Sequence, residues 1–249
     1  MSSLPDPPQE PRLTIADHLE ELRRRLGVSL AVLLTAAGLS LLVVERVIGW
    51  LQRPVEGLLP RFAFFSPAEP LAAYVKVAAL TGFLAALPVI LWQLWRFVQS
   101  GLTPKERRYG RTFIWWGSLQ FLAGAAFAYY GLLPVSLKVL LGIGTHLFQP
   151  MISIDRYLSF VTSLVFWCGV ISELPAALAL LAKVGIVTPE WLRQQRAYAV
   201  LVLVIIAAVV TPTTDPVNLF LMAVPLILLY ELSIWLTRLA APDKGRSRG

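Results

Sequence analysis

The sequence has a single cysteine and two histidines, and only 15% of its 249 residues are charged. One cysteine, Cys168, excludes an intrachain disulfide and a cysteine-based metal site. His18 and His146 lie in different segments, so no Ser/His/Asp set can be proposed, and the sequence contains no Gly-rich phosphate loop. We therefore expect no enzymatic activity, no cofactor or metal, and no transport driven by ATP hydrolysis in this chain.

Long apolar runs take the place of the missing charges. Apolar residues make up 57% of the chain, whereas soluble domains carry about 25% charged residues and lack such runs. A helical membrane protein with several spans is the class that fits this composition. The net charge of +7 does not indicate nucleic-acid binding, because the basic residues flank the apolar runs and form no single patch.

The runs predict an all-α polytopic membrane protein with six transmembrane helices. We expect a disordered cytoplasmic leader over residues 1–13, a membrane domain over residues 14–238 and a cytoplasmic tail over residues 239–249. The last two spans are short, and such a hairpin should thin the membrane around it. The expected spans are residues 26–44, 71–98, 113–133, 157–181, 197–210 and 217–235.

Basic residues are divided unevenly between the two sides of these spans. With the N-terminus inside, the cytoplasmic segments hold 16 of the 22 Lys and Arg residues and the outer loops hold 6. The positive-inside rule therefore predicts that both termini are cytoplasmic. Pro134 is expected to close the third span, since proline ends many helices.

An amphipathic helix is predicted just before the first span, over His18–Leu26. Its polar face carries Glu20 and Glu21, and a third acid, Glu106, lies in another cytoplasmic segment at the start of a helix. A solvated charged face is enough to explain Glu20 and Glu21, and helix capping is enough to explain Glu106. Carboxylates also suit bidentate recognition of guanidinium groups, so a ligand with two adjacent arginines could use them.

Glu173 is an acid about seventeen residues into the fourth expected span. An intramembrane acid costs about 2.5–3.5 kcal/mol on insertion scales and usually faces protein or water. It either joins helices through a hydrogen bond or forms a polar site where a partner helix or a proton docks. Asp215 is followed by Pro216, and this pair predicts the start of a helix with Asp215 as its cap. A role of Asp215 in transport is the second interpretation.

The order and spacing of these motifs resemble the TatC family, the multi-spanning receptor of the twin-arginine protein export system. The resemblance extends from about Thr14 to Trp235. The motifs that carry it include His18-Leu19-Glu20-Glu21-Leu22-Arg23, Ser66-Pro67-Ala68-Glu69, Gly101-Leu102-Thr103-Pro104-Lys105-Glu106, Glu173-Leu174-Pro175, and Thr211-Pro212 with Asp215.

The resemblance implies export of folded proteins across an energy-coupling membrane, driven by the proton-motive force. It implies that twin-arginine signal peptides bind at the cytoplasmic face, and that TatA-type and possibly TatB-type single-span proteins, membrane lipid and further copies of the chain are partners. Carried over by position, the residues that hold, frame or support the twin-arginine motif are Glu21, Arg23, Glu106, Glu20, Phe97 and Pro54. Glu173 and Asp215 would contact partner helices.

Three positions depart from the family's pattern, and all concern partner docking. Cys168 and Ser172 replace the Phe residues that usually flank the Gly before the intramembrane Glu, and Leu219 stands where a Gln is usual. From the residues alone, the alternatives are a proton-coupled secondary transporter that uses Glu173, and an insertase or scaffold without signal recognition. The absence of an inverted repeat in the sequence disfavours the transporter.

Overall fold

The computed structural model describes residues 15–56, 62–99, 110–142, 151–183, 185–210 and 216–240. Within these ranges the chain is almost entirely helical, and a β-bridge pairs Ala63 with Ser153. The predicted all-α class is confirmed.

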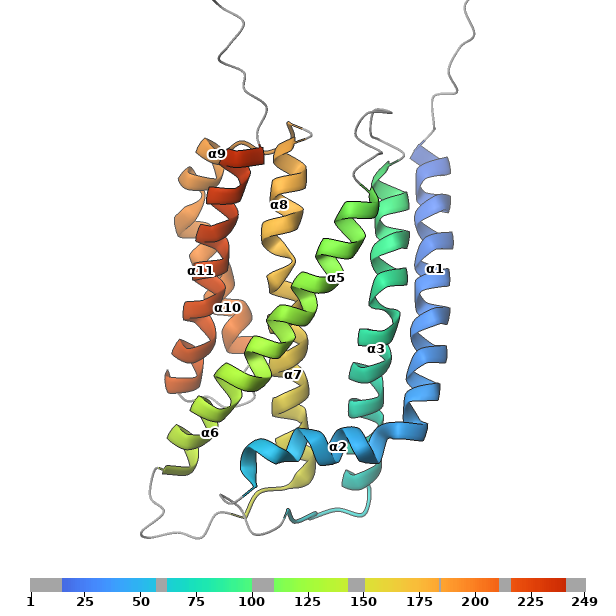
Figure 1. The fold of residues 1–249 in the computed structure, drawn as a ribbon, viewed down its shortest axis with the longest axis vertical. Coiled ribbons are helices and arrows are strands. Elements are labelled where there is room, and N and C mark those ends of the chain that lie inside the picture. The colour runs from blue at the N-terminus through green and yellow to red at the C-terminus, as the bar shows by residue number, and fades with distance from the viewer. Residues whose placement is uncertain are drawn as a thin grey trace, which may run out of the picture.

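The N-terminal part is a long helix followed by a short one at a sharp angle. Helix α1 (Ile15–Ser40) packs along α3 (Glu69–Val98), and after the turn η1 (Leu41–Val43) the chain enters α2 (Val44–Gln52) and η2 (Arg53–Val55). Figure 1 shows α2 lying across the lower part of the bundle, nearly perpendicular to α1. Its buried residues, Val44, Ile48 and Leu51, share one helical face, so α2 lies against the bundle.

The third helical segment is longer than the sequence predicted. Helix α5 (Gly110–Phe127) passes through a π-helical turn, η4 (Ala128–Leu132), into α6 (Leu133–Gly142). The prediction that Pro134 closes this span is wrong, since the helix continues for eight residues beyond it. Pro134 falls in the first turn of α6, where a missing N–H is tolerated.

The fourth segment is divided at Glu173, the residue between α7 (Ile154–Ser172) and α8 (Leu174–Lys183). The chain then forms α9 (Pro189–Gln194), α10 (Arg196–Val210) and α11 (Pro216–Ala240). Helix α9 begins at an N-cap, because the Thr188 side chain accepts a hydrogen bond from the Trp191 amide at 3.2 Å.

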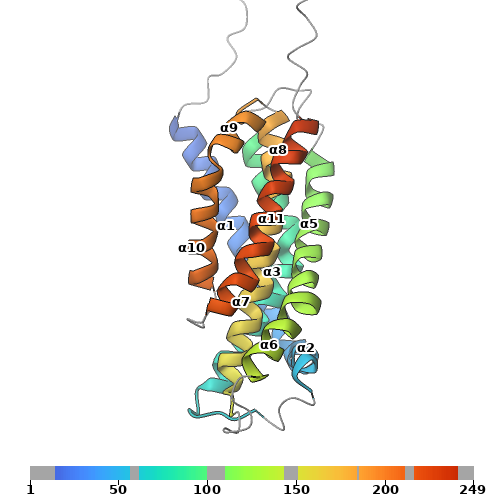
Figure 2. The same cartoon turned by 90° about the vertical axis from the view of Figure 1, so that its left-hand side faces the viewer.

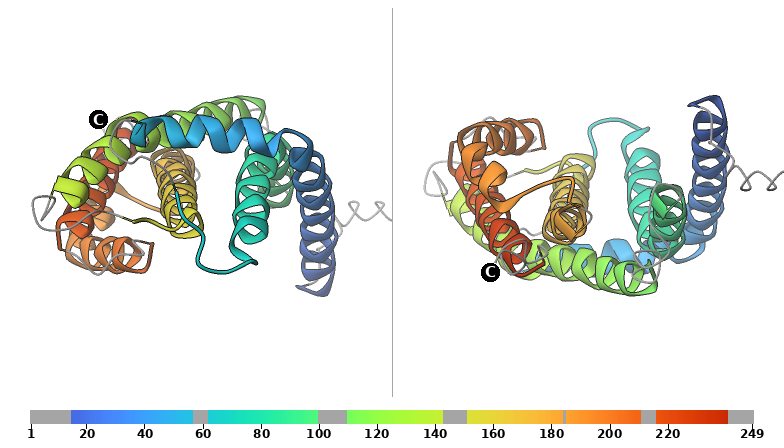
Figure 3. Two further views of the ribbon diagram at one scale, coloured as in Figure 1. Left: turned by 90° about the horizontal axis from the view of Figure 1, so that it is seen from below. Right: turned by 90° about the horizontal axis from the view of Figure 1, so that it is seen from above.

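The helices form an arc around the central column of α7 and α8 (Figure 3). The start of α1 and the end of α11 lie at the same end of the bundle (Figure 1), which we call the terminal end. At the opposite end, Lys76 of α3 contacts both Asp155 (2.5 Å) and Ser159 (2.8 Å) of α7. The terminal end is the one that the sequence predicts to be cytoplasmic.

Five described stretches are long and apolar enough to cross a membrane: Leu19–Val55, Glu69–Val98, Ile114–Gly142, Ile154–Lys183 and Leu219–Leu239. The fifth expected span, α10, is shorter, with 15 residues, or about 22 Å at 1.5 Å per residue. Figure 2 shows it confined to the half of the bundle nearest the terminal end. The expected shortness holds for α10 alone, because α11 has 25 residues and continues past Trp235 to Ala240.

Candidate functional site

An ion pair within α1 lies at the terminal end, and its arginine also forms a hydrogen bond with α3. The Arg25 guanidinium donates to the Glu21 carboxylate, with Nε 3.0 Å from Oε1. Its Nη1 also donates to the side-chain oxygen of Gln93 on α3, at 3.3 Å. Arg25 is only 8% exposed. Burial and two partners fix its orientation, so Glu21 is held against a guanidinium on the amphipathic helix that the sequence predicted.

A cavity of about 300 Å³ lies beside this pair, between α1 and α3. We call it the arginine pocket, and its lining residues are Arg24, Arg25, Val28, Gln93 and Arg96. It therefore brings three guanidinium groups to one place. Sequence reasoning missed Gln93 and Arg96 as pocket residues. Their spacing of three on α3, beside a helix that carries three consecutive arginines, was the available signal.

Only some of the other residues expected at the signal-peptide site lie on the two helices that form this pocket. Glu20 and Arg23 are exposed on α1, and Phe97 follows Arg96 near the end of α3. Pro54 lies in η2 after α2, at the end of the bundle opposite to the start of α1 (Figure 1). Any effect of Pro54 on that site would therefore act through the fold. Glu106 lies outside the described residues.

Glu173 is packed inside the bundle where α7 meets α8. Its carboxylate lies over Gly117 of α5, where an added Cβ would be 2.9 Å from Oε2 and 3.0 Å from the Leu91 side chain of α3. Both carboxylate oxygens are buried, and neither has a hydrogen-bond partner among the described residues. An unsatisfied polar group in a membrane protein is a functional-site candidate.

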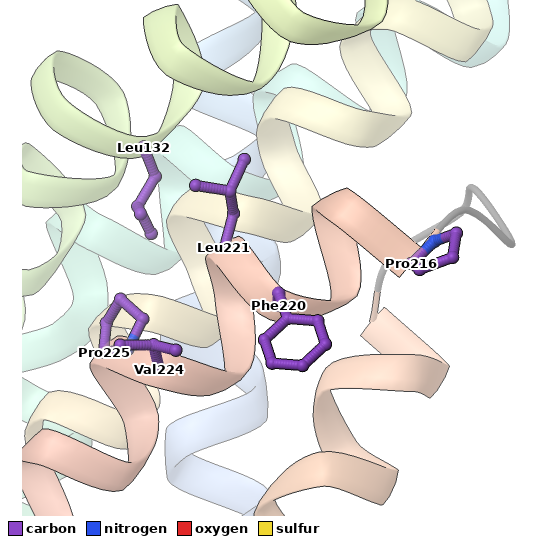
Figure 4. A pocket seen from close by; sticks show the side chains of 6 residues that line it. All are labelled: Leu132, Pro216, Phe220, Leu221, Val224 and Pro225. Atoms are coloured by element: carbon purple, nitrogen blue, oxygen red, sulfur yellow. The ribbon is translucent and has the colours of Figure 1, made fainter.

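The second residue expected to meet a partner, Asp215, lies outside the described residues. Helix α11 begins directly after it, at Pro216, as the sequence predicts. An apolar pocket of about 520 Å³ lies at this start, and the labelled side chains in Figure 4 line it. A second pocket of about 740 Å³ shares Pro225 with it and continues along α11, opposite Gln120 of α5.

Both pockets lie along α11, and their other walls come from helices far apart in the sequence, so local sequence patterns do not predict them. Gln120, an amide within an apolar run, was the only local signal.

Comparisons with known proteins agree with this architecture. A family model described as "Sec-independent protein translocase protein (TatC)" matches residues 17–225. A Sec-independent protein translocase protein TatC from Aquifex aeolicus is 39% identical over 236 residues, covering 93% of this chain and 98% of the relative. A chloroplastic relative of the same description from Arabidopsis thaliana is 37% identical over 232 residues, covering 93% of this chain and 68% of the relative.

The fold also matches a solved structure. The crystal structure of a twin arginine translocase receptor, TatC, superposes with a TM-score of 0.83 at 39% sequence identity. The match covers 90% of this chain and 99% of that one.

Proposed function

Because the chain belongs to the TatC family of Sec-independent protein translocases, we propose that Glu21 of α1 helps to bind the paired arginines of twin-arginine signal peptides. The chain is a multi-pass membrane protein of the twin-arginine translocase. Its receptor role concerns export of precursor proteins, which sets aside the transporter and insertase alternatives. In this proposal the chain is a receptor without catalytic activity of its own.

The observation that carries this proposal is the Glu21–Arg25 pair. Glu21 already accepts hydrogen bonds from a guanidinium within this chain, so its carboxylate is placed and oriented for that group. A ligand arginine would share or replace Arg25 at the same carboxylate. Glu106 would supply the second carboxylate, with Glu20 and Arg23 framing the site and Phe97 and Pro54 supporting it.

The proposed partners bind elsewhere on the chain. TatA-type single-span helices, and TatB-type ones where they exist, would contact Glu173 and the start of α11 after Asp215. The apolar pocket at Pro216 and Phe220 supports this proposal, because a transmembrane helix presents an apolar surface of matching chemistry. Further copies of the chain would complete the receptor complex, and the proton-motive force would drive export.

The test uses the full-length protein in lipid nanodiscs and a fluorescent twin-arginine signal peptide, with a twin-lysine peptide as control. We expect the twin-lysine peptide to bind at least about tenfold more weakly, because an ammonium cannot form the bidentate contact. Glu21→Gln and Glu106→Gln should weaken binding of the twin-arginine peptide, and Glu106→Asp should weaken it less than Glu106→Gln. Equal affinity for the two peptides would refute the proposal, and equal binding by all Glu106 variants would remove Glu106 from the site.

A further inference from the structure

The arginine pocket has more positive charge than the described residues around it neutralise. Arg25 is paired with Glu21 and Gln93. Arg24 and Arg96 are exposed, and neither has an ion pair or hydrogen bond with another residue that the structure describes. Among the described residues, Glu21 is thus the one carboxylate that is paired with any of these three guanidiniums. Such clustering is unfavourable unless an anion joins it, and the planar guanidinium suits bidentate binding of phosphate.

The surroundings of the pocket place it where lipid headgroups meet acyl chains. Leu26 and Leu30 of α1 and Trp92 of α3 are all exposed on the helices that form the pocket. Exposed Leu on a spanning helix faces acyl chains, and exposed Trp is typical of the membrane interface. Val28 adds an apolar wall to the pocket itself. A ligand that fits both parts has an anionic head and an apolar tail.

We propose that the arginine pocket binds the phosphate of an anionic membrane phospholipid, with Arg24 and Arg96 as its principal contacts. The acyl chains of this lipid lie along the exposed faces of α1 and α3. A basic pocket between transmembrane helices on the cytoplasmic side is a known type of headgroup site. The apolar surroundings favour a lipid over a free phosphate ion.

This lipid also affects how the neighbouring Glu21 carboxylate binds a ligand. This step rests on the proposed function of Glu21. The phosphate offers Arg25 a second anionic partner and neutralises the guanidiniums that repel incoming arginines. Glu21 then has more capacity to accept a ligand guanidinium. Because coupling between two binding sites is reciprocal, an anionic lipid and a twin-arginine peptide should each strengthen binding of the other.

The first experiment counts lipids that remain bound to the full-length protein. Protein from nanodiscs of phosphatidylcholine mixed with phosphatidylglycerol is analysed by native mass spectrometry. The double variant R24Q/R96Q should retain less phosphatidylglycerol than the wild type. The matched control is R193Q/R238Q, which removes two exposed arginines at the same end of the bundle but outside the pocket.

Three outcomes decide this experiment. Loss of phosphatidylglycerol in R24Q/R96Q but not in R193Q/R238Q supports the site, and equal retention by all three proteins overturns it. Displacement of the lipid by inorganic phosphate alone would overturn the lipid assignment in favour of a free-anion pocket. If R24Q/R96Q does not fold, the single variants R24Q and R96Q are compared with R193Q in the same way.

The second experiment measures affinity for the twin-arginine peptide with and without phosphatidylglycerol. We expect the lipid to strengthen wild-type binding by about fivefold, the lower end of usual coupling between sites, and to have no effect on R24Q/R96Q. An equal lipid effect in both proteins would overturn the coupling. If the peptide fails to bind in either lipid while retention of phosphatidylglycerol still requires Arg24 and Arg96, the proposed function fails and the lipid site stands.

Discussion

At the scale of single residues, Glu173 is an acid whose insertion into the membrane costs free energy and whose carboxylate has a specific position. The carboxylate fits because Gly117 has no side chain, and its oxygens are buried without a partner among the described residues. A donor on a partner helix would reduce the cost of this group in the membrane, about 2.5–3.5 kcal/mol on insertion scales. The proposed partner contact therefore requires that a partner helix bring a donor to this carboxylate, where α7 meets α8.

We therefore expect Glu173→Ala to weaken association with a TatA-type partner while leaving affinity for the twin-arginine peptide within about twofold, a difference of less than 1 kcal/mol. The measurement is the crosslinking yield between the two proteins in membranes, beside peptide binding in nanodiscs. Glu173→Gln keeps the shape and one acceptor oxygen, so it should fall between the wild type and Glu173→Ala. Unchanged crosslinking in both variants would count against a partner contact at this residue.

At the scale of elements, the crossing of α1 and α3 depends on one glycine. A Cβ at Gly82 would lie 2.4 Å from both the Cα and the N of Ala37, and backbone atoms cannot move aside as a flexible side chain can. Gly82→Ala should therefore push α1 away from α3 and separate Arg25 from Gln93. We expect a lower thermal midpoint and at least about tenfold weaker twin-arginine peptide binding, or 1.4 kcal/mol.

Gly38 provides a matched control for this substitution. It is the residue after Ala37 on α1, and a Cβ there meets nothing within 4 Å. Since Ala is favoured over Gly in helices by about 1 kcal/mol, Gly38→Ala should keep or raise the thermal midpoint and keep peptide binding. If both variants lost binding equally, flexibility of α1 rather than its close approach to α3 would be the cause.

Helix α2 is held by tyrosines from two different helical segments. The Tyr129 hydroxyl donates to the Trp50 carbonyl at 2.5 Å, and the Tyr157 hydroxyl donates to the Leu51 carbonyl at 2.7 Å. Both carbonyls belong to the last turn of α2, where the Trp50 carbonyl also accepts a hydrogen bond from the Arg53 amide. The tyrosines therefore cap this helix from outside.

Tyr157→Phe should lower the free energy of unfolding by about 1–3 kcal/mol, because it leaves a buried carbonyl without its donor. Denaturant titration of the protein in detergent micelles measures this change. Tyr198→Phe is the control, since Tyr198 of α10 is exposed and no hydrogen bond of its hydroxyl occurs among the described residues. Equal stability of the two variants would show that the Leu51 carbonyl finds another donor, such as water.

The sequence predicted most elements because apolar runs and capping residues are local signals. The long helices, the start of α9 at Thr188 and the start of α11 at Pro216 all follow from such signals. Helix α2 was missed, since its nine residues include charges and its buried face has meaning only against the bundle. The continuation through Pro134 was missed because a π-helical turn has no sequence signature that we could use.

The candidate site was predictable to a similar degree. The Glu21–Arg25 pair follows from its spacing of four on one helix. The contribution of Gln93 and Arg96, and the role of Gly117 in accommodating Glu173, depend on how three helices pack. Local spacing therefore identified single residues, while the pocket required the tertiary structure.

At the scale of the whole molecule, the hydrophobic length differs greatly from one side of the bundle to the other. Helix α3 has 30 residues, or about 45 Å, whereas α10 has 15 residues, or about 22 Å. A hydrocarbon core of about 30 Å is therefore spanned fully at α3 but not at α10. Local thinning of the bilayer around α10 would remove this mismatch.

Two lysine substitutions at matched depths test this thinning. Val209 is 78% exposed and lies thirteen residues after Arg196 of α10, while Leu39 is 63% exposed and lies fourteen residues after Arg25 of α1. In a bilayer of uniform thickness both positions lie about 20 Å below the terminal interface. Leu39→Lys should then lower the free energy of unfolding in nanodiscs by more than about 1 kcal/mol and by at most about 2.5–3.5 kcal/mol, the cost of a charge at the helix centre.

If the membrane is thinned at α10, Val209→Lys should lower the free energy of unfolding by less than about 1 kcal/mol. The ammonium then reaches water directly or by snorkelling. The comparison removes the general effect of adding a lysine, since both side chains face away from the bundle. Nanodiscs with longer acyl chains should raise the cost at Val209 more than at Leu39, because thinning a thicker bilayer is harder. Equal losses at the two positions in all lipids would mean that α10 sits in a bilayer of ordinary thickness.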